Sequence, residues 1–467
     1  MLAQIIDNAL KRWITSSTYH VGNIDTELIN MVQYRQKRIA VSSLEKLMDT
    51  LEQRDLFLTG GAGVGKSYLT NEVISAYRKA GKQVVALGST GVSAVNVGGF
   101  TIHSFFAFGI SGNFDELTQS DKRNKKRLTD LKKILKATDL IVIDEISMVS
   151  TDLMDMILYR LENYSYSGRL LLVGDFYQLP PIVKGGKSGL FGEMLFAFES
   201  TAWQRIDPAV IVLTEMKRTQ DAEFTHILSK VREGICDDEV VQYMLDLCNH
   251  EDVYESEPTY LFGRNAEVEQ RNRSSLNRLD TEETIIFASL EKFGAVHEKR
   301  LESWKKLLPV SEQLTLKVGV PILFTVNKWG KFVNGERGTL RAIEEEYLLV
   351  EKEGEFVRVE RHEFDLLDMV VHDDGKVEQL SLATLKQFPL KLAYAVTIHK
   401  SQGMSIDRLV CDVNHIFAPS QFYVAISRAT DPKQLKIDFG RGDIAPYLQR
   451  VIQVDERVKR YYAKESE

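Results

Sequence analysis

The segment of this sequence best suited to chemistry is a glycine-rich run that ends in Lys66 and Ser67. It reads Gly60-Gly61-Ala62-Gly63-Val64-Gly65-Lys66-Ser67 and fits the pattern G-x-x-x-x-G-K-[ST]. The glycines let backbone N–H groups turn inward around phosphates, while Lys66 reaches the β- and γ-phosphates and the Ser67 hydroxyl binds Mg²⁺. We therefore predict a site for Mg²⁺ and a nucleoside triphosphate such as ATP, formed by Gly61, Ala62, Gly63, Val64, Gly65, Lys66, Ser67 and Tyr68.

Two acidic residues at the end of an apolar run could supply the hydrolytic half of such a site. The run 141–143 leads into Asp144 and Glu145. A strand here would deliver Asp144 beside the phosphate loop as a second Mg²⁺ ligand, usually through water. Glu145 would then orient or deprotonate the attacking water. A strand that ends in a helix cap has the same pattern, but the phosphate loop favours the catalytic interpretation.

A third apolar run ends in the segment Gly174-Asp175-Phe176-Tyr177-Gln178. Gln178 could bond the γ-phosphate and report its loss. Phe176 or Tyr177 could offer a face to a stacked base. The alternative is a turn that is closed by the two prolines that follow at 180 and 181.

These loops need a scaffold that brings them to one edge, and the alternation of patterns predicts it. Apolar runs alternate with helical patterns, which is typical of βαβ units and a parallel α/β sheet. The runs of the first unit are 55–60, 82–90, 137–145 and 168–175. A second set of strand-like runs begins near 205 and comprises 209–215, 259–265, 391–400 and 408–413.

The remaining segments have a different character. Residues 1–50 are expected to form an N-terminal helical segment, and the polar stretch 106–136 an exposed insertion into the first unit. Short strands with glycine turns in 300–388 predict a small antiparallel barrel inserted into the second unit. The predicted domains are therefore 51–204 for the first α/β unit, and 205–299 together with 389–467 for the second.

Composition limits the class of protein. The chain has 467 residues, of which 44% are hydrophobic and 27% charged, which excludes disordered, collagen-like and coiled-coil chains. With 59 basic against 66 acidic residues, a wholly basic coat protein is excluded, but a local groove for nucleic acid is not. Cys236, Cys248 and Cys411 lack the spacing of metal ligands and predict reduced thiols.

The sequence carries no apolar run long enough for a membrane span, and its first residues do not resemble a secretory signal. They are also neither Arg-rich nor Ser-rich, unlike a mitochondrial leader. We therefore expect no membrane partner and a place in the cytoplasm of a bacterium or a phage host.

Taken in order, the motifs resemble those of superfamily-one helicases. GGAGVGKS is followed by STGVSAVNVGGFTIHSFF, IVIDEISM, LVGDFYQLPP, LTEMKRT, AYAVTIHKSQGMS and YVAISRAT. The strings DEISM, GDFYQLPP and YAVTIHKSQG are most similar to the Pif-one (petite integration frequency) DNA helicases, with RecD-like and phage Dda helicases as neighbours. The motifs span residues 60–429, about four-fifths of the chain.

The resemblance implies a fold and an activity. Two RecA-like P-loop domains would hold ATP between them, with an SH3-like β-barrel as the insertion. The enzyme would hydrolyse ATP, bind single-stranded and forked DNA, move 5′ to 3′ and unwind the duplex. Members of the family act in DNA replication, repair, recombination and telomere maintenance. We expect a monomer.

The resemblance also assigns roles to individual residues. Arg218 and Arg428 match the two family arginines that reach ATP from the second domain, where a planar guanidinium can stabilise charge on the γ-phosphoryl oxygens. With Lys66, Asp144, Glu145 and Gln178 they complete the catalytic set. The single-strand path is matched by Thr90, Thr101, His103, Thr397, His399 and Ser401, types of side chain that contact phosphates without reading sequence. Phe105 is predicted to stack on a base, although Phe105 or its neighbour Phe106 could equally lie in the core.

Several features are less well determined. Segments 317–319 and 332–338 resemble the start of the family's DNA-clamping barrel, and the Asn334-Gly335 pair also fits an ordinary hairpin turn. The adenine-contacting glutamine of the family has no clear counterpart, because Gln33, Gln36 and Gln53 all lack its context. The basic stretch 121–136 could meet duplex phosphates, but a solvated face is the favoured interpretation.

Three other functions remain open at this stage. The chain could be a single-strand translocase with weak unwinding, a nucleic-acid-binding protein with a relic ATP site, or a P-loop switch without DNA. The intact catalytic set argues against the relic. The segments TIHSFF and TIHKSQG argue against the switch.

Overall fold

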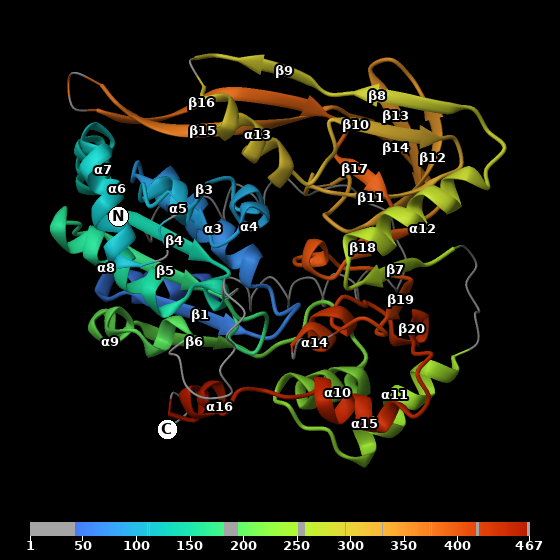
Figure 1. The fold of residues 1–467 in the computed structure, drawn as a ribbon. Helices are drawn as coiled ribbons and strands as arrows, with labels where there is room; N and C mark the ends of the chain where they lie inside the picture. The colour runs from blue at the N-terminus through green and yellow to red at the C-terminus, as the bar shows by residue number, and fades with distance from the viewer. Residues whose placement is uncertain are drawn as a thin grey trace, which may run out of the picture.

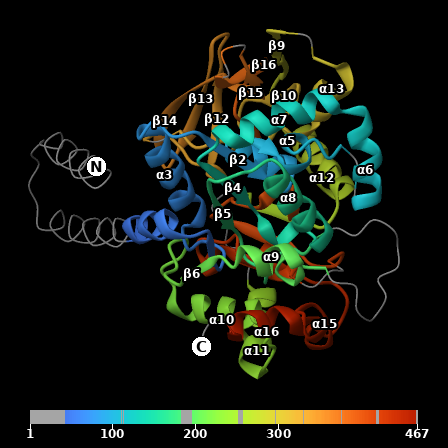
Figure 2. The same ribbon diagram turned by 90° about the vertical axis from the view of Figure 1, so that its left-hand side faces the viewer.

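The computed structural model describes residues 43–464 except 110, 112, 182–194, 251–256, 295, 329, 373, 375 and 417–419. Most of the expected N-terminal segment, including Gln33 and Gln36, therefore lies outside the described residues. Residues 43–53 are helical, so the described part of the expected segment, 43–50, is a helix that continues to residue 53. Figures 1 and 2 show two α/β units that lie below a β-rich insertion. In the described part of the chain, no helix is both long and apolar enough to cross a membrane.

The first α/β unit is built on one sheet whose strands are all parallel. The sheet order is β3-β2-β4-β5-β1-β6. Its strands are β1 (Leu56–Gly60), β2 (Val84–Gly88), β3 (Phe100–Thr101), β4 (Leu140–Asp144), β5 (Arg169–Val173) and β6 (Ala209–Leu213). Along β1 and β4, alternate side chains enter two separate cores, because helices cover both faces of the sheet. This double burial explains the uninterrupted apolar runs.

Helices and short 3₁₀ turns connect these strands. They are α3 (Lys66–Lys79), α4 (Gly91–Asn96), α5 (Ile102–Phe105), α6 (Phe114–Arg123), α7 (Lys125–Ala137), η1 (Ile146–Met148), α8 (Thr151–Asn163), η2 (Ala197–Glu199) and α9 (Thr201–Ile206). Polar side chains begin several of them, since Thr90, Asn113, Ser150 and Ser200 each accept a bond from a backbone N–H of the first turn.

The second unit has a smaller parallel sheet with the order β18-β7-β19-β20. The strands are β7 (Thr259–Phe262), β18 (Ala395–Thr397), β19 (Leu409–Asp412) and β20 (Leu435–Asp438). The helices and turns are α10 (Ala222–Arg232), α11 (Asp238–Asn249), α12 (Asn265–Asn277), η3 (His399–Ser401), α14 (Gln421–Ile426), η4 (Pro432–Gln434) and α15 (Ile444–Val451). Residues from α10, α11, α14 and α15 share one core with this sheet.

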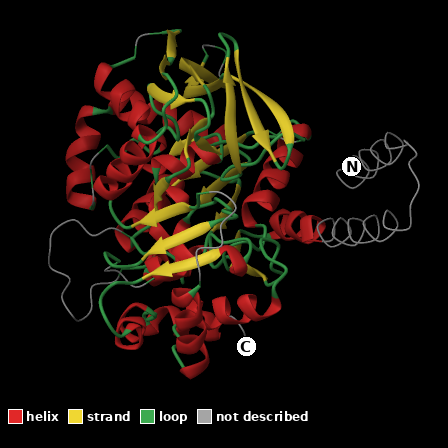
Figure 3. Ribbon diagram, turned by 90° about the vertical axis from the view of Figure 1, so that its right-hand side faces the viewer, coloured by secondary structure: helices red, strands yellow, loops and turns green. Residues whose placement is uncertain are grey.

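The insertion between the halves of the second unit is antiparallel, as its glycine turns predicted. Its elements are β8 (Glu283–Phe287), β9 (Ser289–Lys292), α13 (Glu298–Leu307), β10 (Gln313–Lys317), β11 (Pro321–Phe324), β12 (Arg337–Ile343), β13 (Tyr347–Lys352), β14 (Glu355–Glu360), β15 (His362–Val371), β16 (Val377–Gln387) and β17 (Leu390–Leu392). They form three sheets, β14-β13-β12-β11-β17, β15-β16-β9 and β10-β8. Figure 3 shows these strands gathered above the helix-flanked parallel sheets.

The predicted bounds of this insertion, 300–388, are too narrow. Antiparallel pairing begins with β8 and ends with β17, because β8 pairs with β10 and β17 pairs with β11. One core contains residues of β8, β10, β11 and β17, including Ile286 and Leu390. The strand pairs show an antiparallel insertion, while its closure into an SH3-like barrel stays a prediction.

Two further predictions need correction. The run 209–215 was predicted in the second unit, but β6 pairs along its whole length with β1 of the first sheet. An apolar run predicts a strand without predicting its partner, and α9 here returns the chain beside β1. The stretch 106–136 is only partly exposed, because Leu131, Ile134 and Leu135 of α7 are buried in the first core. Their spacing makes α7 an amphipathic helix with its basic face outward.

The last helix, α16 (Glu456–Lys464), leaves the second unit and packs against the first. Val458 lies in the first unit's core, with Tyr461 and Tyr462 packed against it. Arg457 forms an ion pair with Glu199 at 3.3 Å. In Figure 1 the chain runs from α15 across to α16 beneath the first unit. The C-terminal segment thus ties the two units together.

Candidate functional site

The glycine-rich loop joins β1 to α3 and has the backbone that its sequence predicts. Gly63 and Gly65 have φ of 80° and 95°, where a side chain would be strained. At Gly60 a Cβ would lie 2.3 Å from the carbonyl oxygen of Leu213. Lys66 begins α3, and its Nζ donates to the carbonyl oxygens of Gly60 and Gly61 at 2.7 and 2.8 Å. The loop therefore holds the Lys66 amine at its own carbonyl oxygens.

A pocket opens beside this loop and is lined by both α/β units. Ser67, Asp144 and Glu145 come from the first unit, while Gln402 and Gly403 come from the second. Burial, together with the neighbouring Glu145, raises the pKa of Asp144 to about 7. Two crowded carboxyl groups beside a hydroxyl are a set of hard oxygen donors, which suits Mg²⁺ bound with a triphosphate. Ser67 and Asp144, the two predicted metal ligands, thus line the same pocket, and their binding of Mg²⁺ stays a prediction.

Glu145 has an unusual backbone. Its φ of 54° and ψ of 48° lie in the left-handed region, which residues other than glycine rarely adopt. Such strain is tolerated where the surrounding structure fixes it, and it is concentrated at functional sites. Burial also raises the pKa of Glu145, and a carboxylate with a raised pKa is a better proton acceptor near neutral pH.

The two predicted arginines meet at the boundary between the units. Arg218 donates to Ser405 Oγ at 3.0 Å and to the carbonyl oxygen of Ser427 at 2.6 Å. A Cβ on Gly63 would lie 2.6 Å from the Cβ of Arg218, so this arginine borders the phosphate loop. Arg428 is 2% exposed. Burial lowers the pKa of both groups, and the charge of Arg428 lowers that of Arg218 further.

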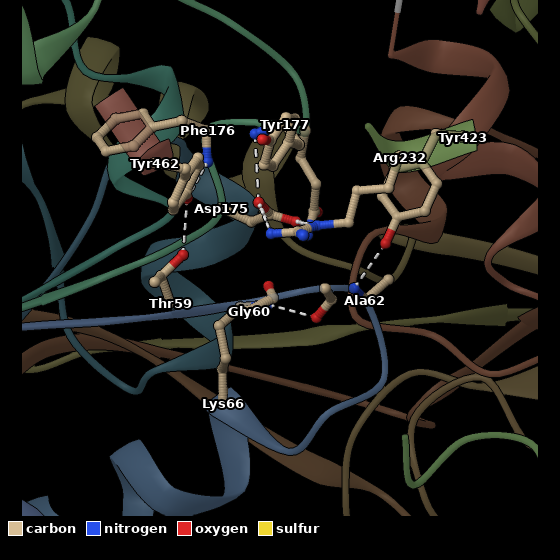
Figure 4. A network of polar contacts seen from close by, with 12 residues as sticks. Thr59, Gly60, Ala62, Lys66, Asp175, Phe176, Tyr177, Arg232, Tyr423 and Tyr462 are labelled. Carbon is tan, nitrogen blue, oxygen red and sulfur yellow. Dashed lines mark hydrogen bonds and ion pairs between the residues drawn. The ribbon is translucent and has the colours of Figure 1, made fainter. Parts of the chain in front are cut away.

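Figure 4 shows Asp175 and Arg232 at the centre of a buried network that sequence reasoning did not foresee, and Gln178 belongs to this network. Its Nε2 donates to Asp175 Oδ2 at 3.2 Å, and Arg232 of α10 forms an ion pair with the same carboxylate at 2.8 Å. Tyr423 of the second unit accepts a bond from the backbone N–H of Ala62 at 2.9 Å. A lone arginine at the end of a helix has no distinguishing pattern, so no sequence signal identified Arg232.

The aromatic residues predicted to stack on bases are in the core. Phe105 and Phe106 are 3% and 0% exposed and pack edge to face, with 5.0 Å between ring centroids. Phe176 is 2% exposed among Phe57, Trp203 and Tyr461. The prediction of Phe105 as a DNA-stacking residue is therefore wrong. The spacing of an aromatic residue does not distinguish a buried ring from one that faces a groove.

Of the hydroxyl residues predicted to contact DNA, two are half-buried and two are buried. Thr90 and Thr101 are half-buried and cap α4 and α5, and Thr90 also lines the pocket beside Ser67. Ser401 is wholly buried and donates to the carbonyl oxygen of Ile398 at 2.8 Å, so its predicted direct contact is wrong. Thr397 is 5% exposed and accepts a bond from the backbone N–H of Lys400.

The remaining predicted residues lie nearer to solvent. His399 is exposed, and His103 is half-buried with its ring edge-on to Phe108. Tyr68 is 45% exposed directly after the phosphate loop. Gln53, the described candidate for an adenine contact, is exposed at the end of the helix before β1. The basic stretch 121–136 keeps an exposed face of seven lysines and arginines, namely Lys122, Arg123, Lys125, Lys126, Lys132, Lys133 and Lys136.

Comparison with known proteins places this site in a family. Residues 31–242 match the model of the PIF1-like helicases, and residues 344–442 match a herpes helicase model. The ATP-dependent DNA helicase Pif1 of Campylobacter jejuni is 41% identical over 437 residues, which cover 90% of this chain and 97% of that protein.

Solved structures agree. Bacteroides Pif1 in complex with ADP-AlF4 is similar with a TM-score of 0.76 and 26% identity, over 90% of this chain and 96% of that one. Bacteroides Pif1 bound to single-stranded DNA has a TM-score of 0.59 at 26% identity, over 91% of this chain and 97% of that one. The arrangement of parallel sheets flanked by helices is thus shared along almost the whole chain. The chain belongs to the PIF1-like helicase family.

Proposed function

We propose that this protein is an ATP-dependent DNA helicase that moves 5′ to 3′ along single-stranded DNA and separates the duplex ahead of it. The observation that carries the proposal is the pocket that Ser67, Asp144 and Glu145 share with Gln402 and Gly403. Because both α/β units line it, a nucleotide bound there would contact each of them. Binding and hydrolysis would then change how the units sit against one another.

The residues around the pocket would each contribute a different step of ATP binding and hydrolysis. Lys66 and the loop N–H groups bind the phosphates, Ser67 and Asp144 would hold Mg²⁺, and Glu145 accepts the proton of the attacking water. When bound, Mg²⁺ supplies charge that offsets the phosphate oxygens and fixes their orientation. Arg218 and Arg428 approach from the other side of the cleft, where their charge stabilises the transferred phosphoryl group.

Coupling between ATP hydrolysis and DNA binding is supported by sequence proximity, because residues that line the nucleotide pocket lie close along the chain to a residue of the predicted DNA path. Gln402 and Gly403 line the nucleotide pocket, and the exposed His399 lies only a few residues earlier in the same segment. Thr90 lines the pocket as well, and belongs to the predicted single-strand path. A shift of either segment on hydrolysis would therefore alter a DNA contact. Relatives named as DNA helicases and one solved with single-stranded DNA support DNA as the partner.

The direction of movement is tested with tailed duplexes. With ATP and Mg²⁺, we expect unwinding of a duplex that carries a 5′ single-stranded tail and none of a duplex with a 3′ tail. Unwinding from the 3′ tail would contradict the proposed polarity. Displacement of streptavidin from a single strand without duplex unwinding would favour the translocase instead. We also propose that the protein acts as a monomer in a bacterial or phage-host cytoplasm. The mass of its complex with DNA tests whether it is a monomer.

A further inference from the structure

A network of buried contacts joins the γ-phosphate-sensing loop to the second α/β unit. Its centre is Asp175, which is wholly buried. Arg232 holds both carboxylate oxygens, with Nε 3.1 Å from Oδ2 and Nη2 2.8 Å from Oδ1. A two-point contact of this kind fixes the orientation as well as the distance. Gln178 donates to the same carboxylate at 3.2 Å, so its amide is held through Asp175.

The pair between Asp175 and Arg232 crosses from one unit to the other. Asp175 follows β5 of the first sheet. Arg232 ends α10, whose residues Phe224, Ile227 and Leu228 belong to the core of the second unit. A change in the distance between the units therefore pulls on Asp175, and through it on Gln178.

The C-terminal helix braces the same loop from the first unit's side (Figure 4). Tyr462 Oη lies 2.8 Å from Thr59 Oγ1 and accepts a bond from the backbone N–H of Phe176 at 3.2 Å. Its ring is parallel to that of Tyr177 with 4.8 Å between centroids. The guanidinium of Arg232 lies over Tyr177 at 4.4 Å. Because Thr59 precedes the phosphate loop, Tyr462 connects that loop to the sensing loop.

We infer that Arg232 and Tyr462 are positioning residues for ATP hydrolysis, which act through Asp175 and the 175–178 loop to place the Gln178 amide at the γ-phosphate. Arg232 makes this placement depend on the second unit, and Tyr462 makes it depend on the docking of α16. The inference rests on the proposed function, because it presupposes that Gln178 meets the γ-phosphate. Neither residue needs to touch the nucleotide.

The first test is Tyr462→Phe, which removes one oxygen and keeps the ring stack. We expect the kcat of DNA-stimulated ATP hydrolysis to fall by about three- to tenfold, because the neutral hydrogen bonds of the Tyr462 hydroxyl to Thr59 and Phe176 are both lost, with KM for ATP within about twofold of wild type. The matched control is Tyr447→Phe. The Tyr447 hydroxyl donates to the carbonyl oxygen of Val413 at 2.8 Å inside the second unit, away from the network. This control should leave kcat unchanged.

The second test is a double-mutant cycle between Arg232 and Gln178. If Arg232 acts through Gln178, Arg232→Ala slows the wild-type enzyme but adds nothing to Gln178→Ala. Wild-type kcat in Tyr462→Phe, an equal loss in Tyr447→Phe, or full additivity in the cycle would each overturn the inference. Absence of ATP hydrolysis by the unsubstituted protein would instead overturn the proposed function. Because the unsubstituted protein is assayed before any variant, the two failures are distinguishable.

Discussion

At the scale of single residues, the site sets like charges against one another on both sides of the cleft. The half-buried Asp144 and Glu145 place two carboxyl groups next to each other on the first unit, and the pKa of each is raised. The half-buried Arg218 and the buried Arg428 bring two guanidinium groups to the boundary with the second unit. A metal-bound triphosphate carries both signs, so it would relieve both clusters at once.

Glu145→Gln should abolish turnover and preserve nucleotide binding. The amide keeps the shape of the side chain but cannot accept a proton, and removal of a general base costs roughly 10²- to 10⁴-fold in rate. Steady-state ATP hydrolysis measures kcat, and a fluorescent ATP analogue measures affinity. A hydrolysis rate equal to that of the unsubstituted enzyme would remove Glu145 from the mechanism.

Arg428→Ala should slow hydrolysis through the transition state. An arginine supplied across a cleft contributes roughly 10³-fold or more to phosphoryl transfer, so kcat should fall by that order. The exposed Arg441, changed to Ala, is the matched control and should keep the normal rate. Equal rates in the two variants would show that Arg428 does not reach the phosphate. Circular dichroism should confirm that both remain folded.

The residues that sequence predicts best are those whose role is set by local chain geometry. The loop from Gly60 to Ser67 is one continuous segment, so its pattern is visible. The bond that the backbone N–H of Phe176 donates to Tyr462 links positions 286 residues apart, and no local sequence pattern predicts it. Phe105 shows the opposite failure, because its pattern suits either a groove or a core. Only packing around it decides between the two.

At the scale of elements, the β15–β16 hairpin is fastened to the first unit through one carboxylate. Asp368 accepts bonds from Arg127 of α7 at 3.0 Å and from Arg300 of α13 at 2.9 Å. Met369 and Val377 extend the contact into the first unit's core. Burial alone would raise the pKa of Asp368, but the two arginines outweigh it and the pKa lies below its ordinary value.

Asp368→Asn should loosen this hairpin. Loss of the charge leaves two partly buried arginines without their partner, which costs about 1–3 kcal/mol. Amide hydrogen exchange in 362–371 and 125–137 should therefore accelerate by about tenfold or more. The control is Glu363→Gln. Glu363 lies on the same strand as Asp368 and forms an exposed ion pair with Lys386 of β16, so its loss should change the exchange rates little. Unchanged exchange in Asp368→Asn would show that apolar packing alone holds the hairpin.

The pH dependence of the fastening follows from the sign of the shift. A carboxyl group with a lowered pKa stabilises the folded arrangement at pH values above its ordinary pKa, and that stabilisation is lost as the pH falls through the lowered value. The contact is therefore complete at neutral pH. Exchange compared in the range of pH 6 to 8, after correction for the intrinsic rate, should show the same protection of the hairpin.

Elements were predicted more reliably than their partners. Every strand of the first sheet except the short β3 coincides with an apolar run in the sequence. The partner of β6 was missed because parallel pairing joins segments far apart, and the same run would suit either sheet. The antiparallel insertion was recognised from its glycine turns, but β8 and β17, which flank it, have no such turn to mark them.

At the scale of the whole molecule, several connections run across the boundary between the units, and we single out three of them. They are the shared pocket at Ser67 and Gln402, the pair between Arg232 and Asp175, and the passage of the chain to α16. Each lies near the nucleotide motifs, and the pocket segment leads on to the predicted DNA path. The units therefore have the means to move together when a nucleotide binds.

The measurement that tests this account most directly is steady-state ATP hydrolysis with and without a short oligo-dT strand at fixed low salt. If the nucleotide pocket and the single-strand path are coupled, the strand should raise kcat by about tenfold or more, a change of roughly 1.4 kcal/mol in the activation barrier. A high rate that is indifferent to DNA would contradict the account and favour a P-loop switch. Tight DNA binding without hydrolysis would contradict it as well, in favour of a relic site.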